Sequence, residues 1–416
     1  MLLEKEKYQR NSRYHLIEGA LYMSTNALIA LQTLMPALIK RLGGNDVLVG
    51  AWPVVVYLAF FLPQIFSANY SGQLQYRKPT VIRLGFLQRI HILILACCIG
   101  MWGASMPFLT LILLFVLYIL NQVISGLVSP IWMDFFIKTT TPENRGKLIG
   151  LRTSTSAVLG LVNSFILTLF LTVFPYPLNY AVIIGFAFLY QMSSLFVQHR
   201  IKEDNPSIIS IPIRMNYLFR HVRSLIHKNS VFRKFLFSSM LLTISFTSIA
   251  FYTVSAIQRC TINEMTIGIF TILTLVGQII SGTFVGWLAD LKGTKSALLI
   301  CAGSLILSIG LSILATSEIW YYLIFLLVGI TTGSEVAMRY YFAIECAPED
   351  ERPMYVGIMN GSLAPCYLIT PFAGFFSSIF GYNSIFIFSL IVGLVGFIFL
   401  VAVPEPRFKK LALSSK

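Results

Sequence analysis

Residues 382–403 read YNSIFIFSLIVGLVGFIFLVAV and contain no charged side chain. Because about 20 apolar residues in a helix span the hydrocarbon core of a membrane, this stretch alone predicts a transmembrane helix. The whole chain of 416 residues is built in the same way, with 56% hydrophobic and 12% charged residues. An average soluble protein carries about 25% charged residues. The composition therefore predicts a membrane protein and excludes a soluble enzyme, a disordered chain and a nucleic-acid-binding domain.

Eleven further runs, bounded by charges, Pro, Gly and Asn, have the same character. They are continuously apolar, whereas the strands of a membrane barrel alternate between apolar and polar residues, so helices are expected. The sequence thus predicts an all-α polytopic membrane protein with 12 transmembrane helices. The predicted spans are 14–38, 47–68, 84–104, 107–134, 148–174, 178–198, 235–257, 264–289, 296–316, 319–345, 354–380 and 382–403.

The basic residues orient these spans. If the N-terminus is cytoplasmic, 26 of the 31 Lys and Arg residues fall on the inner side, and only Lys40, Arg41 and Arg259 fall outside. Basic residues concentrate in cytoplasmic loops, so a multi-pass protein of the cytoplasmic (inner) membrane with both termini inside is expected. The net charge of +14 requires no nucleic acid, because anionic lipid head groups are sufficient partners.

One long polar interval divides the chain nearly in two. It predicts an N-terminal six-helix bundle over residues 1–198, a cytoplasmic linker over 199–234 and a C-terminal six-helix bundle over 235–416. Within the linker, apolar residues such as Met215 and Leu218 follow helical spacing, with basic residues mainly on the other side. This pattern is typical of an amphipathic helix that lies on the membrane surface, and a regulatory partner site is the alternative.

The two halves repeat one another. Arg145 precedes Gly150 by five residues in the segment that leads into the fifth span, and Arg352 precedes Gly357 by five in the segment that leads into the eleventh. The two arginines are 207 residues apart, about half the chain. Internal duplication is the expected design of an alternating-access transporter.

The inner end of the eighth span carries the sequence GWLADLKGTK over residues 286–295. It resembles the signature inner-loop motif of the major facilitator superfamily, G-x-L-a-D-r-x-G-r-k. The resemblance implies two pseudo-symmetric six-helix bundles and a contact that latches the inner gate. In the first half the corresponding segment, 69–78, keeps only its terminal basic pair and has Gln73 in place of the acid. The predicted gating residues are Gly286, Asp290, Lys292, Gly293 and Lys295 of the motif, with Asp134, Arg145, Arg152 and Arg352 at inner helix junctions.

The family's fold places spans 1, 4, 7 and 10 around a central cavity. Polar side chains are costly against lipid, so those in the middle of these spans are expected to face inward. Each could serve interhelical packing, but as a set they favour a substrate cavity. The candidates are Asn26, Gln32, Asn121, Gln122, Ser245 and Tyr252.

Three ionisable residues within the spans are further candidates. Glu335 and Arg339 are four residues apart on one predicted helix and can pair directly. Glu335 either binds a substrate cation or a proton, with Arg339 tuning it, or forms a structural ion pair with Arg339. Glu18, about one turn inside the first span, either relays protons or pairs with a cation such as Arg89, Arg145 or Arg152.

These observations favour a secondary active transporter of a small molecule, driven by a proton or solute gradient. No phosphate-binding loop is present, so ATP hydrolysis by this chain is not expected, and the five histidines form no ligand-spaced cluster. We expect a monomer with no cofactor and no metal. Two alternatives come from other classes. One is a transport-inactive sensor or scaffold on the same fold, and the other is a polytopic membrane enzyme, which the short outer loops make the weaker of the two.

Overall fold

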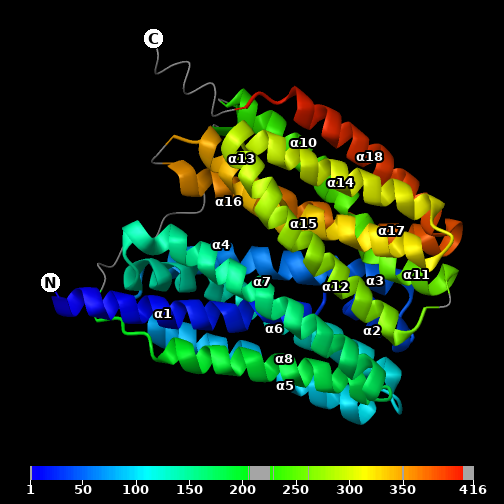
Figure 1. Cartoon of the computed structure of the whole chain (residues 1–416), viewed down its shortest axis with the longest axis horizontal. Coiled ribbons are helices and arrows are strands. Elements are labelled where there is room, and N and C mark those ends of the chain that lie inside the picture. Colours follow the sequence, from blue (N-terminus) through cyan, green and yellow to red (C-terminus); the bar gives the residue numbers. More distant parts are fainter. Residues whose placement is uncertain are drawn as a thin grey trace. The chain divides into compact units, whose positions relative to one another are not determined.

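The computed structural model describes residues 2–204, 206, 225–227, 229–260, 262–348 and 351–405. All regular structure in this part of the chain is helical (Figure 1). The predicted amphipathic helix of the 199–234 linker falls largely outside the described residues. The domain boundaries at 198 and 235 therefore stay a prediction.

The helices follow the predicted spans closely, although most begin or end a few residues away from the expected limits. The first half contains α1 (Leu2–Ser24), η1 (Thr25–Ala27), α2 (Leu34–Arg41), α3 (Asp46–Pro53), η2 (Val54–Leu58), α4 (Ala59–Ser71), α5 (Lys78–Trp102), α6 (Pro107–Thr139), α7 (Pro142–Val173) and α8 (Leu178–His199). The second half contains α10 (Ser230–Phe246), η3 (Thr247–Phe251), α11 (Tyr252–Arg259), α12 (Glu264–Ile280), η4 (Ser281–Val285), α13 (Gly286–Lys292), α14 (Thr294–Leu314), α15 (Glu318–Cys346), α16 (Arg352–Leu363), η6 (Ala364–Leu368), α17 (Ile369–Phe380) and α18 (Tyr382–Ala402).

Eleven helical stretches in the described residues are long and apolar enough to cross a membrane. The predicted first span is the twelfth, and it is broken into α1, η1 and α2 instead of running as one helix. The break begins at Thr25, whose hydroxyl donates to the carbonyl of Tyr22 over 2.7 Å. Such a side chain competes with the helical hydrogen bonds of its own backbone. Twelve helices agree with the predicted fold class, and the chain is a multi-pass membrane protein.

The helices group into two compact units. Unit 1 comprises Met1–Gly44, Val55–Ile213 and Glu264–Gly268, and unit 2 comprises Asn45–Val54, Arg214–Asn263 and Ile269–Lys416. Unit 1 is thus the first half of the sequence without residues 45–54, which begin its second span, and with residues 264–268, which begin the second span of the second half. Unit 2 is the second half with the opposite exchange. The second span of each half is therefore shared between the two units.

In unit 1, α5 packs against α6 and α8, and α1 packs against α7 (Figure 1). The contact between α4 and α6 is close because Gly126 faces the carbonyl of Phe60; a Cβ at Gly126 would lie 2.2 Å from that oxygen. In a membrane, small residues of this kind let helix backbones approach.

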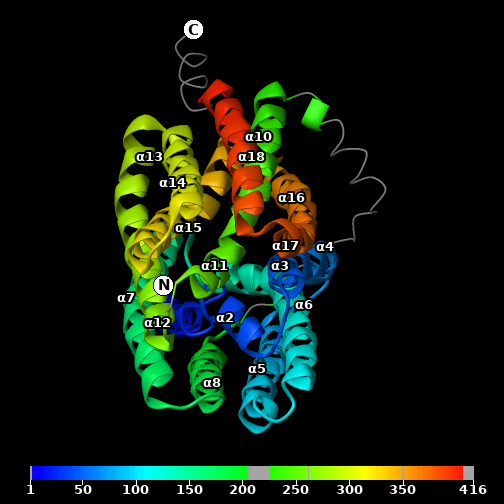
Figure 2. The same cartoon turned by 90° about the vertical axis from the view of Figure 1, so that its right-hand side faces the viewer.

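In unit 2, α10 packs along α18 and α14 packs along α15 (Figure 2). Aromatic rings fill the space between helices: Phe235 of α10 stacks on Phe342 of α15 with ring centroids 4.4 Å apart. Phe232 contacts Tyr355 of α16 at the same centroid distance. Offset and tilted ring pairs stabilise a core beyond the area that they bury.

Two asparagines show that the halves repeat in three dimensions as well as in sequence. The Asn11 side-chain amide donates to the carbonyl of Thr139, at the end of α6, over 3.4 Å. The amide of Asn229 donates to the carbonyl of Cys346, at the end of α15, over 2.9 Å. The two asparagines are 218 residues apart. Each one fixes the start of the first span of its half to the end of the fourth.

Two glutamates repeat in the same way after the last span of each half. Glu203 accepts hydrogen bonds from the backbone N–H of Lys78 over 2.8 Å and from Lys138 Nζ over 2.9 Å. Glu405 accepts from the backbone N–H of Lys295 over 2.9 Å. Each carboxylate therefore caps the N-terminus of the third span of its own half, where the helix dipole favours a negative charge.

Candidate functional site

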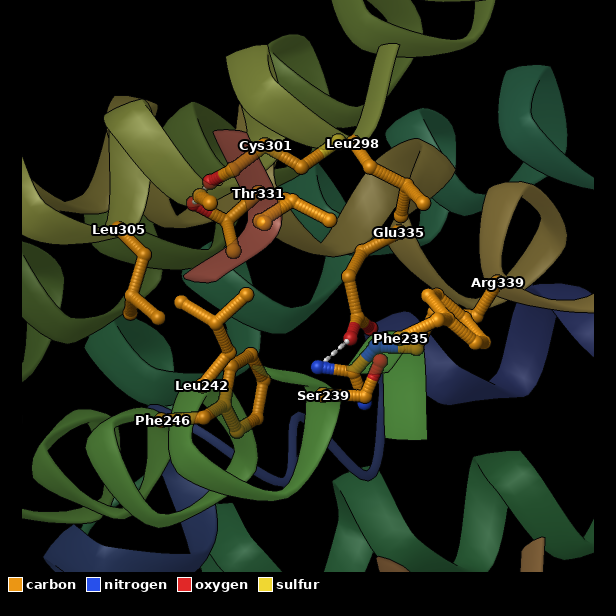
Figure 3. Close-up of a pocket in the computed structure, with 12 residues that line it drawn as sticks. Phe235, Ser239, Leu242, Phe246, Leu298, Cys301, Leu305, Thr331, Glu335 and Arg339 are labelled. Atoms are coloured by element: carbon orange, nitrogen blue, oxygen red, sulfur yellow. Dashed lines mark hydrogen bonds and ion pairs between the residues drawn. The ribbon is translucent and has the colours of Figure 1, made fainter. Parts of the chain in front are cut away.

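The second half contains a buried ion pair on α15. Glu335 Oε1 lies 2.5 Å from Arg339 Nη2, and the two side chains are 13% and 10% exposed (Figure 3). The spacing of one helical turn places both on the same face, as expected from the sequence. Arg339 also donates from Nη1 to the Thr243 hydroxyl of α10 over 2.9 Å. The pair therefore connects α15 to α10.

A small pocket adjoins this pair inside unit 2. It has room for about one water molecule, and its wall is mainly apolar. Figure 3 shows the Glu335 and Arg339 side chains meeting at one side, with Phe246, Leu242 and Leu305 away from them. The lining residues are Phe235, Ser239, Leu242, Phe246, Leu298, Cys301, Ala302, Leu305, Thr331, Glu335, Arg339 and Leu400.

The chemistry of this site follows from its polarity. A charged pair in an apolar surround is stable only while both charges are present, because either one alone would be an uncompensated buried charge. Removal of the Glu335 charge by substitution would therefore weaken its contact with Arg339, which also holds α10. A pocket of this size holds about one water molecule, and a larger solute requires it to widen.

The first half contains a second buried pair, between helices far apart in sequence. Arg152 Nη1 of α7 lies 2.6 Å from Glu18 Oε2 of α1, with side chains 7% and 4% exposed. The same nitrogen donates to the carbonyl of His15 over 2.7 Å. The guanidinium stacks over Trp132 at 4.7 Å from the ring centroid. Of the cations considered for Glu18, Arg152 makes the direct contact.

A second guanidinium is buried nearby. Arg89 of α5 donates from Nε to the carbonyl of Gln191 over 2.6 Å and from Nη1 to the carbonyl of Gly85 over 2.7 Å. It also lies over the ring of Tyr22, with 5.2 Å to the centroid. Backbone carbonyls and an aromatic face thus satisfy this cation within the unit.

The polar candidates of the four central spans occupy different environments. Asn121 is buried and donates to the carbonyl of Gln88 over 2.9 Å. Ser245 is buried and donates to the carbonyl of Ser389 over 2.8 Å. Tyr252 is fully buried, and its hydroxyl lies 3.1 Å from that of Ser308. These three hold neighbouring helices together. In contrast, Asn26 is exposed, while Gln32 and Gln122 are half-buried.

The signature motif, residues 286–295, covers the whole of α13 and the start of α14. Gly293 has φ of +90°, a conformation that side-chain-bearing residues rarely adopt, and a Cβ there would lie 2.5 Å from the carboxyl of Glu405. Lys295 donates from Nζ to the carbonyl of Val401 over 2.7 Å. Lys292 is exposed and Gly286 is half-buried. The Asp290 side chain lies outside the described part of the structure.

The other predicted gating residues have separate partners. Asp134 accepts a hydrogen bond from the Ser71 hydroxyl, and Arg145 donates to the carbonyl of Ile137 over 2.9 Å. Arg152 pairs with Glu18, as described above, and Arg352 begins α16 and is half-buried. In the described part of the chain, Asp134, Arg145 and Arg152 thus each contact different groups. Their role in gating stays a prediction.

Several residues that organise the structure were not among the sequence candidates. They are Asn11, Asn229, Glu203, Glu405, Asp46, Glu264, Tyr180 and Tyr382. A signal for them exists in the sequence. Tyr180 and Tyr382 are 202 residues apart, as are Glu203 and Glu405, and each tyrosine precedes its glutamate by 23 residues.

No group of three or more His, Cys, Asp or Glu residues suited to a metal ion occurs among the described residues. The described fold is that of a helical multi-pass membrane protein. Residues 235–416 match the family model for the Major Facilitator Superfamily. No curated protein matches the sequence.

Solved structures extend the likeness over the whole chain. A D-xylose-proton symporter is 12% identical with a TM-score of 0.69, over 96% of this chain and 98% of the symporter. The nucleoside transporter NupG is 11% identical with a TM-score of 0.68, over 95% of this chain and 98% of that one. A bacterial homologue of the iron transporter ferroportin, in an inward-facing state, is 16% identical with a TM-score of 0.68, over 95% and 98%. At these identities the likeness establishes the fold.

Residues 235–416, somewhat less than half of the chain, thus match the family model for the Major Facilitator Superfamily, and the fold of the whole chain is similar to that of solved membrane transporters.

Proposed function

We propose that this chain is a secondary active transporter that moves a small molecule across the cytoplasmic membrane by alternating access. A proton or solute gradient drives it, with H⁺ as the candidate coupling ion. It acts as a monomer with both termini in the cytoplasm, and it catalyses no covalent reaction. The family match, the duplicated halves and the strong bias of basic residues to one side support this proposal.

The buried Glu335–Arg339 pair is the observation that carries the coupling proposal. Its carboxylate is largely shielded from solvent, it borders a water-sized pocket, and its partner Arg339 holds α10 through Thr243. Proton uptake by Glu335 would remove one charge of the pair and so change the contact between two helices. One acid and one base together also suit a zwitterion or an anion, such as an amino acid, a carboxylate or a sugar derivative, once the pocket widens.

The test begins with a thermal-shift screen of purified protein against amino acids, carboxylates, sugars and nucleosides. Solutes that stabilise the protein are then measured for flux into proteoliposomes under an imposed pH gradient. Wild-type protein should accumulate the solute, and Glu335→Gln should abolish the gradient dependence. Glu318→Gln serves as the matched control, because Glu318 is on the same helix and bonds Tyr322 one turn away over 2.6 Å.

Two outcomes would contradict this account. If the flux and pH dependence of Glu335→Gln equal those of wild type, Glu335 has no part in coupling. If no solute of the panel is transported by wild-type protein, the chain is a sensor or scaffold on the transporter fold. The departure of the first-half motif, with Gln73 in place of an acid, is the feature that would favour that alternative.

A further inference from the structure

Arg89 of α5 is a buried cation whose direct contacts carry no net charge. The residue lies in unit 1 and is 3% exposed. Its Nε and Nη1 donate to the carbonyls of Gln191 and Gly85, and Nη1 lies 3.5 Å from Oε1 of Gln88. These dipoles and the ring of Tyr22 stabilise the guanidinium, but they do not neutralise its charge.

One buried carboxylate, that of Glu18, acts on two buried arginines. It pairs directly with Arg152, at 2.6 Å, and it attracts Arg89 electrostatically without a hydrogen bond to it in the described structure. The three side chains together therefore carry one net positive charge. Burial of a net charge is costly because the interior of a protein solvates it poorly, so the cluster favours the entry of an anion.

Arg89 and Tyr22 also keep hydrogen-bond donors that no described residue accepts. The hydrogen bonds of Arg89 in the described part of the chain use Nε and Nη1, which leaves both hydrogens of Nη2. The Tyr22 hydroxyl accepts from Nε2 of Gln88 over 2.7 Å, and its own hydrogen has no acceptor among the described groups. Buried donors in proteins are nearly always paired, so these donors indicate a place for an acceptor. Because Tyr22 is half-buried, this side of the cluster borders the surface of the chain.

The spare donors of Arg89 and Tyr22 lie next to one another. The guanidinium carbon of Arg89 is 5.2 Å from the centroid of the Tyr22 ring. The Gln88 amide joins the two, since its Oε1 faces Arg89 and its Nε2 donates to Tyr22. Nε2 also donates over 2.7 Å to the Ser125 hydroxyl, whose own hydrogen bonds the carbonyl of Asn121, and this fixes the orientation of the amide. The arginine and the tyrosine are thus held in place before any ligand arrives.

We propose that Arg89 and Tyr22 form a binding site for the carboxylate of a small organic anion, which is the transported solute. Arg89 Nη2 and the Tyr22 hydroxyl each donate to one of its two oxygens. A carboxylate balances the single excess charge of the cluster, whereas a phosphate group carries close to two negative charges at neutral pH. This proposal rests on the proposed transport function and names its substrate class.

The experiment is a thermal-melting titration of the purified full chain in detergent at constant ionic strength. The probes are acetate, lactate and benzoate, with acetamide, lactamide and benzamide as their neutral counterparts and inorganic phosphate as a second anion. A ligand that binds the folded protein raises its melting temperature in a saturable way. At least one carboxylate should do so with the wild-type protein, and its amide and phosphate should not.

Three variants assign the binding to the two residues. Tyr22→Phe keeps the ring beneath the guanidinium and removes one donor, so it should weaken carboxylate binding about tenfold. Arg89→Gln should abolish the shift. Tyr22→Phe changes no charge, so it decides the question if Arg89→Gln does not fold. Tyr190→Phe is the matched control: it removes a hydroxyl from α8 in the same unit, where the ring packs on Phe186, and should leave the affinity unchanged.

Several results would overturn the proposal. They are the absence of a shift with every carboxylate, an equal shift with the amides, a shift with phosphate alone, and an affinity that Tyr22→Phe does not lower. The transport proposal fails separately. If a carboxylate binds as described but no solute is carried into proteoliposomes, the site stands and the transport function falls. If another solute is carried and no carboxylate binds, the transport function stands and the site falls.

Discussion

Replacing Glu18 with glutamine should destabilise the protein by about 3 kcal/mol, because the substitution leaves the guanidinium of Arg152 buried without its counter-charge. The side chains of Glu18 and Arg152 are 4% and 7% exposed, so water cannot replace the lost partner. Arg152 keeps the His15 carbonyl and the face of Trp132, which places the cost near the lower end of about 3–5 kcal/mol for a broken buried pair. Arg152→Gln should cost more, about 4–5 kcal/mol, because the Glu18 carboxylate then loses its guanidinium donor.

The double variant decides whether the two residues act as a pair. Glu18→Gln with Arg152→Gln should lose about 2–3 kcal/mol less than the sum of the single losses, since no isolated charge remains. The free energies of unfolding are measured by SDS titration of the detergent-solubilised protein, followed by circular dichroism. Lys292→Gln, at an exposed position, is the control and should change stability by less than about 0.5 kcal/mol.

Additive losses, within about 0.5 kcal/mol of the sum of the singles, would refute the paired structural role. Flux separates that role from a proton relay. If Glu18 relays protons, the Glu18→Gln protein that remains folded should lose transport driven by a pH gradient. If Glu18 is structural, that folded protein should transport at the wild-type rate.

The remaining predictions concern the inner ends of the helices and the coupling pair. Gly293→Ala should lower the free energy of unfolding by about 1–2 kcal/mol or more, because the positive φ is strained for alanine and the new Cβ meets the carboxyl of Glu405. Gly286→Ala is the control: a Cβ there meets open space, so the free energy of unfolding should not change. Thermal stability in detergent checks both, and equal melting temperatures would contradict the account. Glu203→Gln should lower the free energy of unfolding by about 1–2 kcal/mol, because it weakens the cap at the start of α5. Asp204→Asn, at the neighbouring exposed position, should change the free energy of unfolding little. A larger effect at Asp204 than at Glu203 would contradict the capping role. Glu335→Gln should abolish the pH dependence of transport without loss of the fold, as judged by gel filtration and circular dichroism.

The helical spans could be predicted from the sequence because the membrane imposes their length and apolarity on every one of them. The run at 382–403 corresponds to α18, and ten other runs correspond to long helices within a few residues. The first span was harder, because its apolar composition is continuous while its backbone breaks at Thr25. Apolar composition predicts that a segment lies in the membrane, but it does not predict where the backbone leaves the α-helical conformation, as it does at Thr25.

The site was only partly predictable for a related reason. The Glu335–Arg339 pair follows from the spacing of one helical turn and could be predicted directly. The Glu18–Arg152 pair joins residues 134 apart, so the sequence could only offer several cations as partners. Glu203 and Glu405 stand outside the apolar runs and gave no membrane-burial signal, although their equal spacing from Tyr180 and Tyr382 was present throughout.

Counterflow tests the central claim of alternating access most directly. Proteoliposomes are preloaded with a high concentration of an unlabelled solute found by the thermal-shift screen, and uptake of the labelled solute is followed without any gradient. An alternating-access carrier predicts a transient accumulation of label above its outside concentration that saturates with solute. Uptake that neither saturates nor exceeds equilibrium would indicate a passive pore, and absence of any uptake would indicate a protein that does not transport; either result contradicts the account.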